Sequence, residues 1–192
     1  MRNPEQNLTG NTMMSPRVVA RQRLFIGSHR DLFRVSAALV LWLSVLLSIV
    51  SQPWVIETFV NRIALGLSYF LFSLLQLLGN EIERVGVIIR SDALSMEINH
   101  KCTAVYQVAV YCAGVLAYRT RLRNKAVGLF WGICVISIAN ILRIVAIFYV
   151  GVYTPGWIPF VHNVLGEAFM IVLILITWFL WARRIAGAVP GG

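Results

Sequence analysis

The 192-residue chain is far more apolar than a soluble domain, with 58% hydrophobic and only 13% charged residues. Soluble domains use about 45 to 50% apolar residues, so this composition excludes an ordinary water-soluble protein and predicts a multi-pass membrane protein. The formal net charge of +9 would favour a nucleic-acid partner in a soluble chain. In a membrane protein the position of the charges matters more than their sum, and we expect lipid contact and no nucleic-acid partner.

The N-terminal segment, residues 1–31, is expected to be a flexible, basic cytoplasmic tail with little structure. It combines Pro, Asn, Thr and Arg without apolar periodicity, which is typical of a segment that lies on anionic lipid without folding. The apolar stretch that follows starts near Val35, and no small-residue cleavage site comes after it. A signal peptide is therefore a poor interpretation.

Five apolar runs follow, each close to the roughly 20 residues that a helix needs to cross hydrocarbon. They span residues 32–50, 55–79, 102–118, 126–150 and 160–181. Basic residues gather before the first run, between the third and fourth runs, and after the last run. Because cytoplasmic loops are enriched in Lys and Arg, these three regions are predicted to be cytoplasmic.

The run at 55–79 does not fit that charge distribution as a crossing helix. An even number of crossings must separate the N-terminal tail from the basic loop at 119–125, and the first and third runs already supply two. The polar and charged residues of the run are Glu57, Asn61, Arg62 and Gln76. We therefore expect this run to lie on, or dip into, the outer leaflet. A dimer with a different topology is the lower-ranked alternative.

The segment between the second and third runs has a different character. Its charges nearly balance, and "VGVIIRSDALSMEI" offers two short β-prone strands around Ser91 and Asp92. The predicted fold is thus all-α and multi-pass, with about four membrane-crossing helices, one outer-leaflet helix and a small extracytoplasmic β-hairpin. One membrane-embedded domain is expected over 32–182, followed by a short cytoplasmic tail over 183–192.

Arg143 stands in the apolar stretch "ISIANILRIVAIFYV". A charge at that depth costs roughly 2.5 to 3.5 kcal/mol on insertion scales, so the guanidinium needs a partner. Asn140, one helical turn away, or a backbone carbonyl would give it a purely structural role.

Topology brings two further reactive residues to the depth of Arg143. Cys102 starts the third run and His162 starts the last, both on the outer side, while Arg143 lies seven residues, roughly 10 Å of helix, below Val150. A thiol beside an imidazole and a guanidinium suits thiolate chemistry, because His transfers the proton and cations stabilise the thiolate. Arg143 offers several donors to a developing oxyanion.

Other interpretations of these residues remain open. Cys102 is a packing residue in the simplest view, and His162 follows "YTPGWIPF" as an interfacial histidine would. His100 is a rival base because "NHKC" puts it two residues from the thiol. A zinc site of His100, Cys102, His162 and Glu167 matches no short metal motif.

Cys112 and Cys134 fall near mid-membrane and are interpreted as core residues. Three cysteines leave one unpaired in any case, so no disulfide framework is implied.

Three short motifs, in this order and at helix-sized intervals, resemble those of the exosortases and archaeosortases, which are integral-membrane cysteine transpeptidases or proteases. They are "INHKCTAVY", "NILRI" and the histidine of "FVHNVLGE". The resemblance covers about residues 50 to 182. It implies that Cys102 is the nucleophile, Arg143 stabilises the intermediate and His162 is the acid and base. Asn140 and Thr103 are implied as supporting residues, with no metal or organic cofactor.

The chain differs from the usual pattern of this family in two respects. Family members usually have Gly after Cys-Ser/Thr, whereas Ala104 stands here, and Gly would allow a closer backbone approach. The chain is also shorter than the eight-span members, so it resembles a compact one.

The same resemblance implies the substrates and the location. Substrates would be secreted proteins that end in a recognition motif, a transmembrane helix and a basic tail, cut through a thioacyl intermediate and passed to a surface acceptor or to water. The enzyme would be a multi-pass protein of the cell (inner) membrane with its active site on the extracytoplasmic side. The alternatives are a small transporter, whose discontinuous helices and inverted halves are not found in the sequence, and a non-catalytic assembly subunit with a structural arginine.

Overall fold

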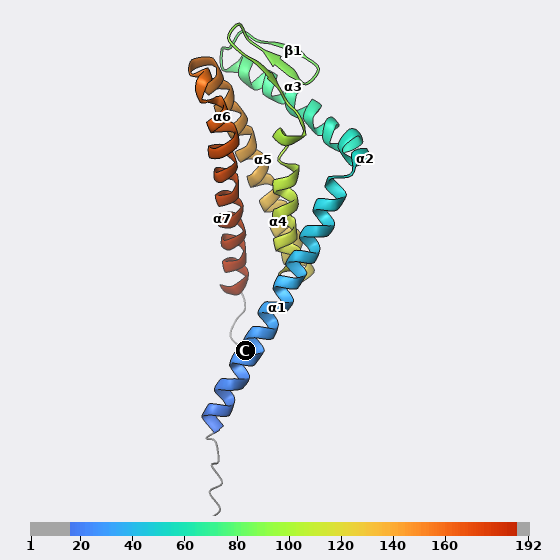
Figure 1. Cartoon of the computed structure of the whole chain (residues 1–192), viewed down its shortest axis with the longest axis vertical. Coiled ribbons are helices and arrows are strands. Elements are labelled where there is room, and N and C mark those ends of the chain that lie inside the picture. Colours follow the sequence, from blue (N-terminus) through green and yellow to red (C-terminus); the bar gives the residue numbers. More distant parts are fainter. Residues whose placement is uncertain (1–15, 188–192) are drawn as a thin grey trace, which may run out of the picture.

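The computed structural model describes residues 16–187, which form a helical bundle with a small sheet at one end, here called the sheet end (Figure 1). Four of the described helices are long and apolar enough to cross a membrane. They are Phe33–Val50, Pro53–Leu77, Leu122–Tyr153 and Pro155–Ile185. The predicted multi-pass helical membrane fold is confirmed.

Helix α1 (Pro16–Val50) is longer than expected. The prediction of a tail with little structure is wrong for residues 16–31, which are helical, while residues 1–15 lie outside the described part of the chain. Proline fits the first turn of a helix, and each residue added to an existing helix gains one hydrogen bond. The apolar segment therefore propagates its helix back into the basic segment. At the other end, α7 (Gly166–Gly187) continues into the expected tail at 183–192.

The second helical segment runs without a break through α2 (Pro53–Val55), the π-helical η1 (Ile56–Val60) and α3 (Asn61–Leu77). Its length and composition would allow it to cross a membrane. In Figure 1, however, α3 lies obliquely beneath the sheet instead of running along the other helices. An orientation across the sheet end is consistent with the predicted outer-leaflet helix.

Helix α4 (Val105–Ala117) differs most from the predicted crossing set. Its 13 residues span about 20 Å, less than the ~30 Å of a hydrocarbon core. The first residues of the predicted run at 102–118 are not α-helical. They belong to a 3₁₀ turn, η2 (His100–Cys102), and to a residue in the left-handed conformation. Apolar composition alone does not reveal such a change in backbone conformation.

The helices α4, α5 (Leu122–Tyr153) and α7 lie side by side below the sheet end (Figure 1). At Gly132 of α5 a side chain would collide with the ring of Tyr111 on α4, whose hydroxyl donates to the Gly128 carbonyl at 2.9 Å. Small residues let helices approach closely in membranes. The indole of Trp181 on α7 occupies the corresponding space at Gly128.

The sheet has three antiparallel strands in the order β1 (Glu83–Val85), β2 (Ile88–Arg90) and β3 (Ser95–Glu97). Strands β2 and β3 are the predicted hairpin around Ser91 and Asp92. Strand β1 was not predicted. It pairs with β2 through a two-residue turn in which Gly86 has a φ of 63°, a conformation that suits glycine in tight hairpins.

Buried isoleucines fasten the sheet to the helices. Ile89 and Ile98 are fully buried in a cluster with Leu71 and Leu75 of α3 and with Phe148 of α5. This packing fixes the sheet over the ends of α3 and α5, and the chain that leaves β3 leads directly into the 3₁₀ turn with Cys102.

We predict that the sheet end faces the outside. In a variant whose three cysteines are replaced by Ala, Asp92→Cys should react with a membrane-impermeant maleimide on intact cells. Arg121→Cys, in the basic loop before α5, should react only after permeabilisation, because basic loops stay cytoplasmic. Labelling of Arg121→Cys on intact cells, with Asp92→Cys protected, would contradict the predicted topology.

Candidate active site

The thiol of Cys102 lies at the junction between the sheet and α4. The residue ends η2 and is 8% exposed. Thr103, the predicted supporting residue, is also buried and donates its hydroxyl to the His100 carbonyl at 2.7 Å, which closes the 3₁₀ turn. The N-terminus of α4 begins directly afterwards, and the partial positive charge of a helix N-terminus favours a neighbouring thiolate.

Ala104 joins the turn to the helix in a left-handed conformation. Its φ of 56° makes it the one non-glycine residue with positive φ among the described residues. L-residues pay roughly 1 to 2 kcal/mol for this conformation, which glycine adopts freely. Glycine, which the resemblance places at this position, would adopt this backbone conformation without strain. Ala104 adopts it at an energetic cost.

Asn140 of α5 holds the backbone of the candidate nucleophile. Its side-chain amide donates to the Cys102 carbonyl at 2.6 Å, and the asparagine is 2% exposed. Its own carbonyl oxygen, Oδ1, has no hydrogen-bond partner. The predicted supporting residue therefore fixes the 3₁₀ turn against α5 and keeps one buried acceptor unused.

Cys102 and His162 line the same cavity, which has a volume of about 270 Å³. Strand β3 and the preceding turn supply one wall, and Ile144 and Ile147 of α5 supply another. The rival base His100 does not line this cavity. Residues 60 positions apart in the sequence thus meet around a space large enough for a peptide group.

His162 lies within a π-helical turn, whereas the sequence places it at the start of the last apolar run. The segment η4 (Val161–Leu165) is a π-helical turn between α6 (Ile158–Phe160) and α7. Such turns occur often at functional sites because they free backbone carbonyls from the regular hydrogen-bond ladder. Here the His162 carbonyl accepts a hydrogen bond from Arg143 Nη2 at 3.1 Å.

Arg143 is buried in α5, with a side chain only 4% exposed. Besides the His162 carbonyl, Nη2 contacts Glu167 Oε1 at 3.0 Å. Its Nε has no hydrogen-bond partner. A Cβ atom at Gly166 would stand 2.5 Å from this Nε, so the missing side chain makes room for the guanidinium. The structure thus gives the buried charge a carboxylate partner that sequence reasoning did not assign to it.

Arg143 faces a different hollow from the thiol. A groove of about 390 Å³ between α5 and α7 is lined by Arg143, Gly166 and apolar residues such as Leu142, Leu165 and Phe169. Ile147 lines both this groove and the thiol cavity. Arg143 therefore stands beside the cavity, between the thiol side of α5 and the apolar groove.

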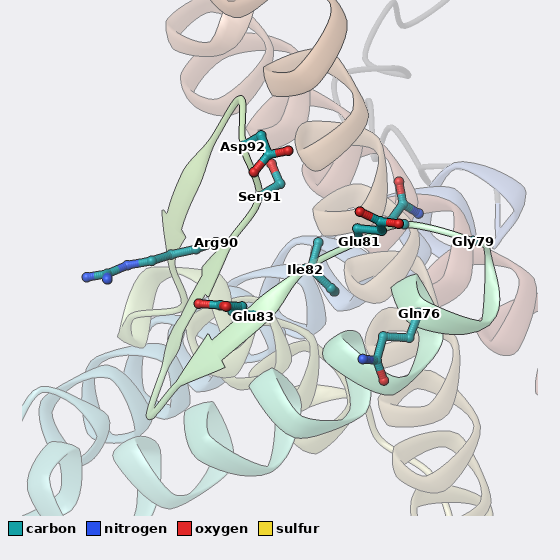
Figure 2. Close-up of a pocket in the computed structure, with 9 residues that line it drawn as sticks. Gln76, Gly79, Glu81, Ile82, Glu83, Arg90, Ser91 and Asp92 are labelled. Atoms are coloured by element: carbon teal, nitrogen blue, oxygen red, sulfur yellow. The ribbon is translucent and has the colours of Figure 1, made fainter.

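A second, polar pocket of about 790 Å³ lies beside the sheet and the end of α3 (Figure 2). Figure 2 shows Glu81, Glu83 and Asp92 among its lining residues. Ser91 and Asp92 line this pocket, and Leu94 from the same turn lines the thiol cavity. The turn thus contributes residues to both hollows.

The Cys102 thiol lies outside the helices long enough to cross a membrane. Burial raises its pKa above the ordinary value; the hydrogen bond with the Asn99 backbone and the charge of Arg143 lower the pKa, and Glu97 raises it. Burial prevails, so the resting group is a thiol. Thiolate chemistry at neutral pH then requires a proton acceptor, and His162 lines the same cavity.

The predicted alternative of a zinc site finds no support in the geometry. No group of three or more His, Cys, Asp or Glu side chains among the described residues is arranged to hold a metal ion. Glu167, one of the residues considered for zinc, contacts Arg143 instead.

A family model described as transmembrane exosortase matches residues 24–180, which include all three motifs and every element around the cavity. The chain belongs to the transmembrane exosortase family. No curated protein and no solved structure matches the chain. Membership of the exosortase family supports a general role as a membrane transpeptidase or protease.

Two residues of the candidate site are not predicted by the sequence in these roles. Glu167 was considered only as a metal ligand, and Gln107, which contacts it, was not considered at all. A signal for Glu167 existed, because a carboxylate just inside the last apolar run lies near the predicted depth of Arg143. Gln107 had no comparable signal, since its neighbour lies 60 residues away.

Replacing Ala104 by Gly should stabilise the protein, because glycine removes the strain of the left-handed conformation. We expect a gain of about 0.5 to 1 kcal/mol after the loss of chain entropy in the unfolded state. The matched control is Ala109→Gly in the interior of α4, which should destabilise by about 1 kcal/mol. Thermal unfolding in detergent measures the stability of both variants. Unfolding temperatures that shift in the same direction in both would contradict the strain inferred at position 104.

Alkylation of Cys102 should depend on pH through the thiolate. With Cys112 and Cys134 replaced by Ala, the iodoacetamide rate should rise with pH to a midpoint above that of an ordinary cysteine, because burial raises the pKa. Arg143→Ala should move the midpoint to higher pH, and Glu97→Gln should move it to lower pH, because their charges act in opposite directions. A midpoint that neither change moves would contradict this electrostatic account.

Proposed function

We propose that this exosortase is a membrane-embedded cysteine transpeptidase or protease that cleaves the C-terminal sorting signals of secreted proteins through a thioacyl intermediate. Its family supports the general activity. The specific roles of the residues rest on one observation, namely that Cys102 and His162 line the same cavity while Arg143 is bonded to the His162 carbonyl.

In the first step His162 takes the proton of the Cys102 thiol, and the sulfur attacks the carbonyl carbon of the scissile peptide bond. A carbon–sulfur bond forms, and the carbonyl oxygen becomes an oxyanion. When the carbon–nitrogen bond breaks, His162 returns the proton to the leaving amine. The substrate's N-terminal part stays on Cys102 as a thioester, and its transmembrane helix with the basic tail is released.

In the second step an acceptor resolves the thioester. His162 removes a proton from the acceptor, which is water in a protease or a hydroxyl or amine of a cell-surface molecule in a transpeptidase. The new bond forms at the acyl carbon, the carbon–sulfur bond breaks, and Cys102 recovers its proton.

Arg143 supplies hydrogen-bond donors to the oxyanion in this proposal. Its Nη2 is occupied, whereas its buried Nε has no partner at rest. A donor held in place before the reaction loses little when charge develops, and its effect is larger where water is excluded. Asn140 and Thr103 support the chemistry indirectly, because they hold the turn that carries the thiol.

One observation favours a non-catalytic membrane subunit instead. Arg143 already has a carboxylate partner, as a structural ion pair would. A structural pair does not, however, require a thiol and an imidazole on the walls of one cavity. The catalytic roles therefore account for more of the geometry.

Processing of a reporter distinguishes the two functions. The chain should be co-expressed with a secreted protein that ends in a short motif, a transmembrane helix and a basic tail, taken from the same genome. Cys102→Ala should abolish cleavage while the protein still inserts. His162→Ala should lower the rate by about 10² to 10⁴-fold, the usual contribution of a general acid or base.

Two variants serve as controls. Cys112→Ala and His100→Ala remove the same chemical groups outside the cavity and should leave cleavage close to wild type. Hydroxylamine should release a hydroxamate from the wild-type protein, because it attacks a thioester in place of the acceptor. Cleavage that survives in Cys102→Ala would refute the proposed enzymatic function. Loss of cleavage in His100→Ala, but not in His162→Ala, would assign the role of the base to His100.

A further inference from the structure

One acidic side chain among the described residues, Glu167, forms an ion pair with Arg143. Its Nη2 contacts Glu167 Oε1 at 3.0 Å, and the exposed fractions of the two side chains are 4% and 46%. An uncompensated charge in an apolar interior is costly, and removing one partner of a buried ion pair leaves the other unpaired. Glu167 is therefore the group that makes burial of the guanidinium tolerable.

Glu167 is itself fixed from a third helix. Its second oxygen, Oε2, accepts a hydrogen bond from Gln107 Nε2 of α4 at 3.4 Å. The contacts Gln107–Glu167–Arg143 thus connect α4, α7 and α5. Since α4 begins just after Cys102, this connection relates the position of the arginine to the helix that follows the thiol.

The two contacts of Nη2 determine which donors of Arg143 stay unused. Nη2 has two protons, and its acceptors are the carboxylate of Glu167 and the carbonyl of His162. The guanidinium is planar, so fixing one nitrogen fixes the direction of the others. Nε remains buried without a partner and lies in the space that the missing side chain of Gly166 leaves for the guanidinium.

We propose that Glu167 is a positioning residue: with Gln107 behind it, it holds the guanidinium of Arg143 on α5 beside the thiol cavity, in the orientation that serves the oxyanion of the reaction. This role rests on the proposed function. Glu167 touches no reacting atom and acts only through Arg143. It is part of the working site, although at first sight it resembles an ordinary structural counter-charge.

The test is a double-mutant cycle on the turnover number kcat and the Michaelis constant KM, measured with the full-length protein in proteoliposomes and the processed reporter. The variants are Glu167→Ala, Glu167→Gln, Arg143→Ala and the double variant Arg143→Ala/Glu167→Ala. Glu57→Gln, which removes an exposed carboxylate from the second helical segment, is the matched control and should match wild type.

Glu167→Ala should lower kcat by about 10²-fold, the usual cost of a misplaced catalytic group, with KM within about twofold of wild type. Glu167→Gln keeps an oxygen acceptor for Nη2 and should stay within about tenfold of wild-type kcat, because only the charge assistance of the bond is lost. In the Arg143→Ala background, Glu167→Ala should cause no further loss. A structural role alone predicts a loss of inserted protein, with the kcat of the protein that does insert unchanged.

Three results overturn the proposal: wild-type kcat in Glu167→Ala, equal damage by Gln and Ala, or a further loss in the double variant comparable to that in wild type. If Glu167→Ala fails to insert, Glu167→Gln and the comparison of Arg143→Ala with the double variant still decide, because the double variant contains no unpaired charge. Failure of the proposed function itself is recognised separately, since Cys102→Ala would then still cleave the reporter.

Discussion

The burial of the Arg143 guanidinium is the constraint on which the site depends. A cation inside an apolar bundle needs acceptors, and here they come from α7 and the π-helical turn before it, as the Glu167 carboxylate and the His162 carbonyl. Because the His162 carbonyl is one of these acceptors, the π-helical turn that contains His162 packs against α5. The burial of the guanidinium also explains Gly166, because any side chain there would occupy the space of the guanidinium. One interaction thus joins the arginine, the histidine segment and the helix contact.

The thiol is positioned by a different set of forces, which act on the backbone. Buried isoleucines fix the sheet over α3 and α5, and the chain leaves β3 through a short 3₁₀ turn. The Thr103 hydroxyl closes that turn, the Asn140 amide holds the Cys102 carbonyl, and Ala104 turns left-handed to start α4. The strain at Ala104 is tolerated because the surrounding packing determines the conformation. Cys102 therefore reaches the cavity on a turn that hydrogen bonds and packing tie to α5 and to the start of α4.

These two arrangements meet at α5. One side of the helix, with Ile144, lines the thiol cavity, and Arg143 and Leu142 line the apolar groove between α5 and α7. A substrate carbonyl that reached this place would leave bulk water and meet donors already held in position, which is how electrostatic stabilisation acts most strongly. The ion pair that allows the arginine to be buried and the chemistry proposed for it are therefore compatible. Glu167 occupies one nitrogen and leaves another free.

Composition, hydropathy and short motifs are local properties of the chain. They were sufficient to predict the membrane environment, the helical class, the hairpin around Ser91 and Asp92, and the exosortase resemblance that the family model confirms. The sequence also suggested that Cys102 and His162 lie near each other, from the order and sidedness of the runs. Tertiary structure alone decided the extension of α1, the shortness of α4, strand β1 and the partner of Arg143. The Arg143–Glu167 contact joins residues 24 positions apart on different helices. No periodicity along one helix encodes which face of another will meet it.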